Sequence, residues 1–480
     1  MNILHVSAEC YPFAKIGGLA DVVGSLPEEL GKQKDTDIRV ILPRYKSIPK
    51  KYVDNAKIVA EYTVNVGDKK LLYAGLMSQV IGNVTYYFID NLFYFGSRDD
   101  VYNYGDEAER FAYFQIAALE GMKKIGFGPD IIHVHDWHTA MIPLLLKTKY
   151  QNDFDAKSVL TIHNLAYQGI FPLNDCHLFG IEYDYRMEFE GFLNFLKAGI
   201  TCADLITTVS PNYSREIMTD YYGYGMQRLL KARANDVKGI LNGIDTKKYD
   251  PATDKMIARN YTADDYRAGK EANRKALEKQ MEASFQKKRP LLGFVSRMVG
   301  QKGIDLIKRV FDEMLETDDF SFVVLGSGEK EYEEYFLGLS QRFPERVYVK
   351  IGYDDKLAHL IYAASDIFLM PSKFEPCGLG QMIAMRYGTI PVVRETGGLA
   401  DTVEPYNEYV PSGNGFSFTN FNAHDMMHVL RYAFTTFGLP KAWDFLVTEA
   451  MKADFSWQKS ARAYKKAYRG LLMTKKGEGK

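Results

Sequence analysis

The stretch "YPFAKIGGLADVVGSLPEEL" (residues 11–30) places a lysine and two glycines at the point where a strand gives way to a helix. Residues 2–7 are short, apolar and β-branched, as in a buried strand, and apolar residues recur at helical spacing after the glycines. Lys15, Gly17 and Gly18 therefore lie on the connecting turn. Unpaired N–H groups at a helix start attract anions, and glycine allows a close approach. The turn predicts a phosphate site; an ordinary turn with a solvated lysine is the alternative.

Length and composition limit the classes of protein to which the chain can belong. A chain of 480 residues is longer than one hydrophobic core usually serves, so we expect two domains. Sixty basic and sixty-one acidic residues give a net charge of −1, which argues against nucleic acid or an anionic membrane as the main partner. No apolar run is long enough to cross a bilayer, and the chain enters a strand at once without a basic, apolar leader.

The four cysteines indicate a reducing compartment. They are scattered and lack the paired spacing of a metal site or a disulfide framework: Cys10, Cys176, Cys202 and Cys377. Together with the absence of a leader, they predict a cytoplasmic protein.

Strand-like and helical segments alternate along the chain in two series. The strand-like segments of the first series are 38–42, 131–135, 158–163 and 205–210, and those of the second are 291–296, 322–326, 347–351, 366–370 and 390–393. Such alternation is typical of a wound, mainly parallel α/β sheet. Residues 57–90 hold three consecutive strand patterns separated by turn residues, which predicts a β-meander inserted in the first sheet.

A polar, lysine-rich segment that begins after Asp245 separates the two series. The sequence predicts an N-terminal wound domain over residues 1–243, a C-terminal wound domain over 244–455, and a C-terminal helix over 456–480 that packs back on the first domain. In wound domains ligands bind at the carboxyl ends of the strands, so we expect the two domains to face a shared cleft.

A second basic loop, "GFVSRMVGQKGID" (residues 293–305), repeats the design of the first one. It runs from a strand through glycines into a helix, and it presents Arg297 and Lys302 at the carboxyl end of the strand. Arginine offers a planar fork for phosphate oxygens and lysine a compact charge, so with Lys15 these cations could enclose a diphosphate. Solvated surface charges are the alternative for each residue taken singly.

The segment "PSKFEPCGLGQMIAMRYGTIPVVRETGGLADTV" (residues 371–403) carries a third group of glycines. Glu375 follows a predicted strand, Gly378 and Gly380 open a helix, and residues 396–398 follow the next strand. A carboxylate beside glycine N–H groups can accept two sugar hydroxyls while the backbone donates to others. The alternative is a glutamate that only stabilises the positive end of its helix, by about 0.3–1 kcal/mol.

Several histidines near the end of the predicted strand 131–135 raise the question of a metal site. His133 and His135 share one face of the strand, and Asp136 and His138 follow. Burial in the strand is the commoner fate of such residues, so we expect no metal.

Many motifs in one order identify a family. They resemble those of bacterial glycogen synthases and plant starch synthases and span nearly the whole chain: KIGGL (15–19), HVHDWH (133–138), TIHNLAYQG (161–169), TVSP (208–211), NGID (242–245), SR (296–297), QKG (301–303), EPCGL (375–379), TGGLADTV (396–403) and FSW (455–457). The resemblance implies a GT-B glycosyltransferase with two Rossmann-like domains. It implies transfer of glucose from ADP-glucose to the 4-hydroxyl at the non-reducing end of an α-1,4-glucan, with retention of configuration, with ADP as product and without a metal or cofactor.

The resemblance also implies a role for each matching residue. The diphosphate contacts are expected to be Lys15, Gly17, Gly18, Arg297, Lys302, Thr396 and Gly397. The adenine is expected to stack on Tyr353, and the donor glucose to lie near His163, Asn242, Glu375, Cys377, Gly378 and Leu379. The acceptor side is expected to include Asp136, Trp137 and His138. We expect Lys15, His163, Arg297, Lys302 and Glu375 to act in catalysis.

Two positions distinguish the chain from other members of the fold class. Many relatives carry threonine where this chain has Gly380, so we expect a hydroxyl contact to the donor to be lost and only a backbone N–H to remain there. Many other GT-B enzymes have a second glutamate at the position of Ile383, and its absence here is a reason to expect the glycogen and starch synthase branch.

Three alternatives stay open at this point. A UDP-glucose donor or a different acceptor, such as a sucrose-type one, is the nearest, because residue chemistry alone does not choose the base. A non-catalytic glycan-binding protein explains the aromatic content of 14% but not the cations on both domains. A nicotinamide-dependent oxidoreductase is expected to have Gly-x-Gly-x-x-Gly after the first strand. This chain has Lys15 and a glycine pair there instead. No oligomeric state is predicted.

Overall fold

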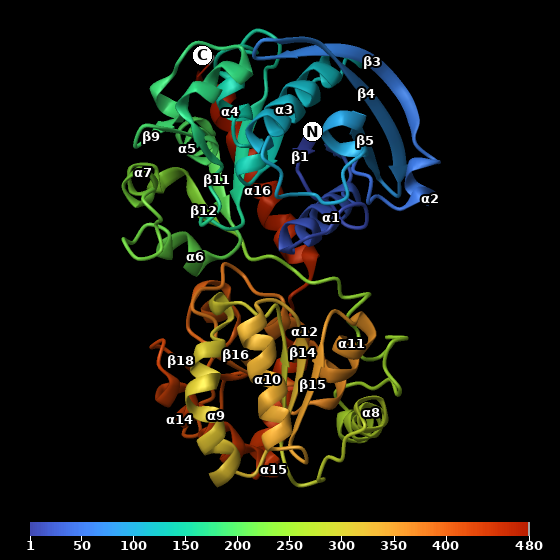
Figure 1. The fold of residues 1–480 in the computed structure, drawn as a ribbon, viewed down its shortest axis with the longest axis vertical. Coiled ribbons are helices and arrows are strands. Elements are labelled where there is room, and N and C mark those ends of the chain that lie inside the picture. The colour runs from blue at the N-terminus through green and yellow to red at the C-terminus, as the bar shows by residue number, and fades with distance from the viewer. Residues whose placement is uncertain (479–480) are drawn as a thin grey trace. The chain divides into compact units, whose positions relative to one another are not determined.

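The computed structural model describes residues 1–478 and divides the chain into two compact units (Figure 1). The first unit consists of Met1–Asn242 and the segment that begins at Trp457, and the second of Gly243–Ser456. The chain therefore leaves the first unit after Asn242 and returns to it at Trp457. The last two residues of the segment predicted over 456–480 lie outside the described residues.

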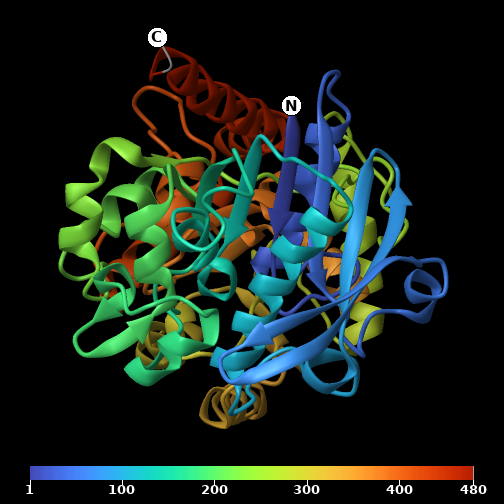
Figure 2. The same cartoon turned by 90° about the horizontal axis from the view of Figure 1, so that it is seen from above.

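The first unit is built on a nine-stranded sheet (Figure 2), in which the strands of residues 57–90, drawn in lighter blue, form one edge. Its order is β12 (Val237–Gly239), β11 (Leu205–Thr208), β7 (Lys157–Ile162), β6 (Ile131–His135), β1 (Asn2–Val6), β2 (Asp37–Pro43), β5 (Val84–Asp90), β4 (Lys69–Ile81) and β3 (Lys57–Val66). From β12 to β5 all neighbours are parallel. β4 is antiparallel to both β5 and β3, which confirms the predicted meander.

Helices cover the strands of this sheet. α1 packs against β2 and α16, α3 against β3 and β5, and α4 against β7 and α5. The helices of the unit are α1 (Gly18–Gly31), α2 (Lys50–Val53), α3 (Glu107–Lys124), α4 (Ile142–Leu146), α5 (Phe195–Cys202), α6 (Pro211–Glu216), α7 (Gln227–Ala232) and α16 (Trp457–Glu478). A small antiparallel sheet contains β8 (Ile170–Pro172), β10 (Phe192–Asn194) and β9 (Glu188–Phe189).

The second unit is a six-stranded parallel sheet. Its order is β15 (Val347–Ile351), β14 (Ser321–Gly326), β13 (Leu291–Val295), β16 (Ile367–Met370), β17 (Ile390–Arg394) and β18 (Phe416–Phe418). Five of these strands agree with the predicted second series. β18 was not predicted, because a strand of three residues is too short to show a period.

The helices of the second unit are amphipathic where they pack on its sheet. α9 buries one stripe at helical spacing, including Ile304, Ile307, Phe311 and Met314. The helices are α8 (Tyr266–Met281), α9 (Ile304–Thr317), α10 (Lys330–Arg342), α11 (Asp355–Ala364), α12 (Gly380–Arg386), α13 (Gly397–Thr402), α14 (Ala423–Phe437) and α15 (Pro440–Lys452).

Short 3-10 and π helices complete the connections of both units. They are η1 (Leu92–Gly96), η2 (Trp137–Thr139), η3 (Leu173–Phe179), η4 (Tyr185–Met187), η5 (Ala234–Asp236) and η6 (Gly300–Lys302). Two of them, η2 and η6, follow the carboxyl ends of central strands and carry predicted site residues.

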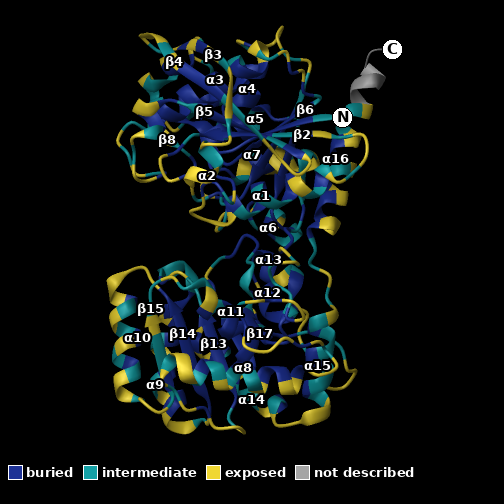
Figure 3. Ribbon diagram, turned by 90° about the vertical axis from the view of Figure 1, so that its right-hand side faces the viewer, coloured by how far each residue is buried: buried dark blue, intermediate teal, exposed yellow. Residues whose placement is uncertain are grey.

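The central strands of each unit are buried along their length (Figure 3). All six residues of β14, Ser321–Gly326, are buried, as expected for a parallel strand covered on both faces. Among the described residues, no helix combines the length and the apolar character that crossing a membrane requires.

Candidate active site

The turn that follows β1 is held by the carboxylate of Glu9. Its Oε2 atom accepts the backbone N–H of Ile16 at 2.6 Å and that of Gly17 at 3.0 Å. Two amides of the predicted phosphate site are therefore already bonded, and the amides that open α1, from Gly18 onward, are the ones left for an anion. Within the described residues, a Cβ atom at Gly17 or Gly18 would have no neighbour within 4 Å, so both glycines leave open space.

Lys15 is paired on the same turn. Its Nζ atom lies 2.7 Å from Oδ1 of Asp21, in the first turn of α1. Both side chains are partly exposed, so the pair contributes at most about 1 kcal/mol, and a more strongly charged ligand can compete for the ammonium group. Asp21 was missed at the sequence level; its signal was an acidic residue in the first turn of a predicted helix.

Asp136 connects the end of β6 to the segment that follows β7. Its Oδ1 atom accepts the backbone N–H of His163 at 2.7 Å and that of Asn164 at 3.4 Å. The backbone of Asp136 has φ +53° and ψ −172°, a combination that is costly for any residue other than glycine. Burial raises the pKa of its carboxyl to about 7. Backbone strain and a strongly shifted pKa both mark Asp136 as a candidate functional residue.

His163 lies beside this carboxylate and is held in the neutral state. Burial lowers the pKa of its imidazole to about 3. One ring nitrogen, Nε2, lies 3.0 Å from Nδ1 of His135. The residue as a whole is 9% exposed and directly follows the carboxyl end of β7, so it lies at the margin of the core.

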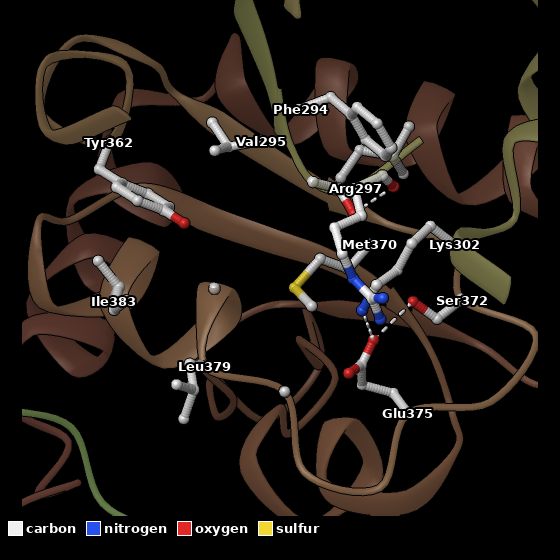
Figure 4. Close-up of a pocket in the computed structure, with 14 residues that line it drawn as sticks. Phe294, Val295, Arg297, Lys302, Tyr362, Met370, Ser372, Glu375, Leu379 and Ile383 are labelled. Carbon is white, nitrogen blue, oxygen red and sulfur yellow. Dashed lines mark hydrogen bonds and ion pairs between the residues drawn. The ribbon is translucent and has the colours of Figure 1, made fainter. Parts of the chain in front are cut away.

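In the second unit Lys302 and Glu375 form an ion pair. The Lys302 Nζ atom lies 2.6 Å from Oε2 of Glu375, and the Ser372 hydroxyl donates to the same oxygen at 3.0 Å (Figure 4). The side chains of Lys302 and Glu375 are 15% and 9% exposed. A cation predicted to bind phosphate and a carboxylate predicted to bind a sugar are therefore paired with each other in this structure.

Gly303 allows this approach of the two loops. It ends η6 with φ +73°, and a Cβ atom there would collide with the backbone carbonyl oxygen of Pro371. The loops are also joined by the N–H of Lys373, which donates to the carbonyl of Gln301 at 2.8 Å.

Arg297 stands in contrast to Lys302. Its side chain is exposed, and within residues 1–478 its guanidinium makes no ion pair or side-chain hydrogen bond. It lines a pocket of about 230 Å³ together with Lys302, Ser372 and Glu375. The rest of the lining is mainly apolar: Phe294, Val295, Tyr362, Leu369, Met370, Leu379 and Ile383. The arrangement places two cations and a carboxylate together in a pocket whose remaining wall is mainly apolar (Figure 4).

The glycine loops beside Glu375 are packed backbone against backbone. The N–H of Gly398 donates to the carbonyls of Glu375 and Pro376 at 3.2 Å. Gly397 has φ +45°, and a Cβ atom there would collide with the Glu375 carbonyl oxygen. The loop that carries Thr396 and Gly397 therefore positions the loop that carries Glu375.

Comparisons with known proteins agree along the whole chain. Residues 2–232 match the family described as "Starch synthase catalytic domain", and residues 276–443 match "Glycosyl transferases group 1". The glycogen synthases of Geobacillus thermodenitrificans and Bacillus subtilis are 47% and 48% identical to this chain, and each match covers 98% of both sequences. The chain belongs to the glycogen and starch synthase family.

A solved structure supports the same assignment. The catalytic domain of starch synthase IV from Arabidopsis thaliana, bound to ADP and acarbose, has a TM-score of 0.89 and 35% identity, covering 98% of this chain and 99% of that one. The fold is the GT-B-like glycosyltransferase fold with two parallel-sheet α/β domains. This member of the glycogen and starch synthase family is a glucosyltransferase of the glycogen synthase type.

The other predicted site residues of this family member lie at several places in the two units. Cys377 is buried at 6% exposure, and Gly378 and Leu379 line the pocket. Tyr353, expected to stack on adenine, is 84% exposed on the loop between β15 and α11. Asn242 is buried at the end of the first unit, and its Oδ1 atom has no hydrogen-bond partner among the described residues.

Trp137 and His138 are packed into the first unit. Their rings stack at 4.0 Å between centroids, and Tyr102 stacks on the other side of His138 at 4.8 Å. Each of the two is less than a tenth exposed, so their ring faces are covered in this structure. Their role on the acceptor side stays a prediction.

The histidine group considered for a metal has a different composition from the one expected. Nitrogen atoms of His5, His133 and His135 lie within 4.8 Å of one another. Both nitrogens of His133, however, are in hydrogen bonds, to Tyr468 at 2.7 Å and Thr161 at 2.6 Å. Nδ1 of His5 and Nε2 of His135 lie 3.1 Å apart and form a hydrogen bond. These contacts favour a hydrogen-bonded cluster, and the absence of a catalytic metal stays a prediction.

The structure gives a physical reason for Gly380. It opens α12, and a Cβ atom there would lie 3.0 Å from Phe368 and 3.3 Å from Met370. A threonine at this position therefore needs a different packing of these two side chains.

Proposed function

We propose that this enzyme elongates an α-1,4-glucan. In this proposal it transfers glucose from ADP-glucose to the 4-hydroxyl at the non-reducing end, with retention of configuration, and releases ADP. The observation that carries the proposal is the pocket where Arg297, Lys302 and Glu375 converge at the carboxyl ends of β13 and β16. The starch synthase IV structure, which contains ADP and acarbose, supports a nucleotide and a glucan-like ligand for this fold.

Charge explains why cations are needed at the diphosphate. As the glucosyl bond breaks, positive charge develops at the anomeric carbon and negative charge on the departing nucleotide. Cations fixed at the diphosphate are therefore worth more in the transition state than before it. We assign Arg297 and Lys302 to this role. Lys15 is assigned to the same diphosphate, and binding there exchanges its contact with Asp21 for one with phosphate.

Glu375 orients the transferred sugar in this proposal. In the structure it shares one oxygen, Oε2, between Lys302 and Ser372, so its other oxygen is the one available to sugar hydroxyls. The backbone of Gly378, Leu379, Thr396 and Gly397 completes the donor site, with Tyr353 against the adenine. His163 and Asn242 contact the glucose, and Asp136 with its neighbours faces the acceptor.

No resident metal or cofactor is needed, because the three cations supply the positive charge that Mg²⁺ supplies elsewhere. We expect a chelator to leave the rate unchanged. The four cysteines are free thiols, which supports our proposal of a cytoplasmic location.

The experiment that tests the proposal supplies the purified protein with glycogen and either ADP-glucose or UDP-glucose. Nucleotide release and polymer growth are followed together. We expect both with ADP-glucose and much less of either with UDP-glucose. Preferred use of UDP-glucose would overturn the donor assignment, and nucleotide release without polymer growth would overturn the acceptor assignment.

A further inference from the structure

A chain of three histidines runs from the core of the first unit to the candidate active site. Nδ1 of His5 lies 3.1 Å from Nε2 of His135, and Nδ1 of His135 lies 3.0 Å from Nε2 of His163. His5 and His135 are fully buried. Only His163, at the outer end, is assigned to the reaction, so the other two histidines have no role in the proposed function.

Strand register explains why the chain forms. β1, β6 and β7 are parallel neighbours, with His5 paired to His133 and His135 paired to Thr161. His133 and His135 point to the same face of β6, because side chains alternate along a strand. His163 is the first residue after β7. Three successive strands thus each contribute one imidazole to the row.

Counting protons leaves two arrangements. Burial lowers the pKa of His5 and of His163 to about 3 and that of His135 well below its ordinary value, so all three rings are neutral and each carries one N–H. A single hydrogen must lie between His5 and His135, and another between His135 and His163, for each pair to form a hydrogen bond. Either every ring carries its hydrogen on Nδ1, or every ring carries it on Nε2.

The buried end of the histidine row, at His5, decides between the two hydrogen arrangements. Nε2 of His5 is buried and has no hydrogen-bond partner among the described residues. In the second arrangement this atom carries an N–H, and a buried N–H without an acceptor is among the rarest features of folded proteins. The first arrangement leaves only a lone pair there. It places the hydrogen of His163 on Nδ1, the nitrogen that does not face His135.

We propose that His5 and His135 are positioning residues that fix His163 in the Nδ1–H tautomer, so that its ring offers a hydrogen-bond donor to an oxygen of the bound sugar. This inference rests on the proposed function, because the sugar is the ligand assigned to His163. Without its hydrogen bond to His135, His163 would exist as a mixture of tautomers. Part of the enzyme would then present a ring lone pair, instead of an N–H, to the sugar oxygen.

The direct test is nuclear magnetic resonance of the ligand-free enzyme with ¹³C,¹⁵N-labelled histidine. Ring carbon and nitrogen shifts separate the two tautomers, and single substitutions assign the nine histidines. We expect Nδ1–H at His5, His135 and His163. An Nε2–H tautomer at His163 overturns the proposal. Because no substrate is present, this readout does not depend on whether ADP-glucose is the donor.

Two variants at one position separate the tautomer effect from packing. His135→Leu removes the link, whereas His135→Asn places an amide N–H near the position of Nδ1 and can still donate to His163. We expect His135→Leu to give mixed tautomers at His163 and about a tenfold lower kcat, and His135→Asn to restore most of both. A single Nδ1–H tautomer at His163 in His135→Leu would contradict the proposal.

His133→Asn is the matched control. His133 is equally buried on the same strand, but its nitrogens bond Tyr468 and Thr161 instead of the chain. We expect this variant to lose stability and to keep the wild-type tautomer at His163. A shift of the His163 tautomer as large as that in His135→Leu would overturn the assignment of the chain. If the wild-type enzyme shows no glucosyl transfer, the proposed function is overturned, whereas the tautomer of His163 is still measured independently.

Discussion

The ammonium group of Lys302 lies 2.6 Å from the carboxylate of Glu375, in a pocket where both side chains are largely buried. The neighbouring Arg297 lines the same pocket without an ion pair among the described residues. The two cations assigned to the diphosphate therefore differ in the ligand-free state. Lys302 already neutralises a buried charge, and only Arg297 is available without rearrangement.

This difference predicts unequal effects of removing the two cations. Lys302→Ala leaves the Glu375 carboxylate buried without its partner, so we expect a loss of stability on the order of 3 kcal/mol in addition to a loss of activity. Arg297→Ala removes an exposed side chain and should leave stability nearly unchanged. Each variant should lower kcat by roughly 100 to 1,000 fold, because each removes a preorganised cation from the departing nucleotide. Thermal unfolding and kinetics at saturating donor measure the two effects.

The double variant Lys302→Met with Glu375→Gln serves as the control for stability. It removes both charges while nearly preserving side-chain volume, so it should recover most of the stability that Lys302→Ala loses and none of the activity. Equal melting temperatures for Lys302→Ala and Arg297→Ala would show that the ion pair does not stabilise the second unit.

Glu9 predicts a second effect, on the loop that carries Lys15. Its carboxylate accepts the amides of Ile16 and Gly17. Glu9→Gln replaces an ionised acceptor by a weaker one, and we expect faster hydrogen exchange at these two amides and weaker binding of ADP, by about tenfold. Calorimetry and exchange measured on one sample test this. The control is Asp21→Asn, which frees Lys15 from its partner without touching the amides and should not weaken ADP binding.

Gly380 predicts a packing effect. Because a Cβ atom there would lie 3.0 Å from the Phe368 ring, we expect Gly380→Thr to cost about 1–3 kcal/mol of stability. Gly338→Ala in α10 is the matched control, because a Cβ atom there meets only the flexible end of Arg342 at 3.4 Å. That change should be neutral or slightly stabilising in a helix. A fully stable Gly380→Thr variant would mean that the Phe368 ring moves freely.

Local patterns were enough to predict the two wound sheets and the loops that carry the candidate site. The glycines and basic residues of segments 15–18 and 297–303 directly follow strands. Ligands bind at the carboxyl ends of parallel strands in this class of fold, so the position of these residues could be predicted without knowing the other strands. The meander over 57–90 was also visible, because its strands are long and its turns carry glycine.

The pairings inside the site could not be predicted from local patterns. Lys302 and Glu375 are separated by 73 positions, and nothing in either segment indicates that one charge neutralises the other. His5 shows no sign of its contact with His135, 130 residues away, until the register of β1 and β6 is known. Such contacts depend on which strands become neighbours, and that is decided by the packing of the whole unit.

The buried histidines of the first unit predict a dependence of stability on pH. Burial lowers the pKa of five imidazoles: His5, His133, His135, His138 and His163. In the unfolded chain a histidine has a pKa of about 6.5. Below that pH the unfolded chain binds protons that the folded unit excludes, so stability is lost as the pH falls, by up to about 1.4 kcal/mol per pH unit for each histidine.

One carboxyl opposes this trend. The pKa of Asp136 is raised to about 7, so its protonated form is favoured in the folded unit, and its contribution grows as the pH falls from about 7 toward 4. The histidines outnumber it, and the net effect is acid destabilisation of the first unit. Hydrogen exchange, corrected for its intrinsic pH dependence, should therefore show a smaller opening free energy for β6 amides at about pH 5.5 than at about pH 7.5.

Two controls make this last prediction specific. Amides of β14 in the second unit, a strand without histidine, provide an internal reference in every sample. His138→Phe keeps an aromatic ring in contact with Trp137 and Tyr102 and removes one titrating group. The number of protons bound on unfolding, which sets the slope of the unfolding free energy against pH, should therefore fall by about one. An unchanged slope in this variant would show that His138 is protonated in the folded enzyme, and that burial does not hold the ring neutral.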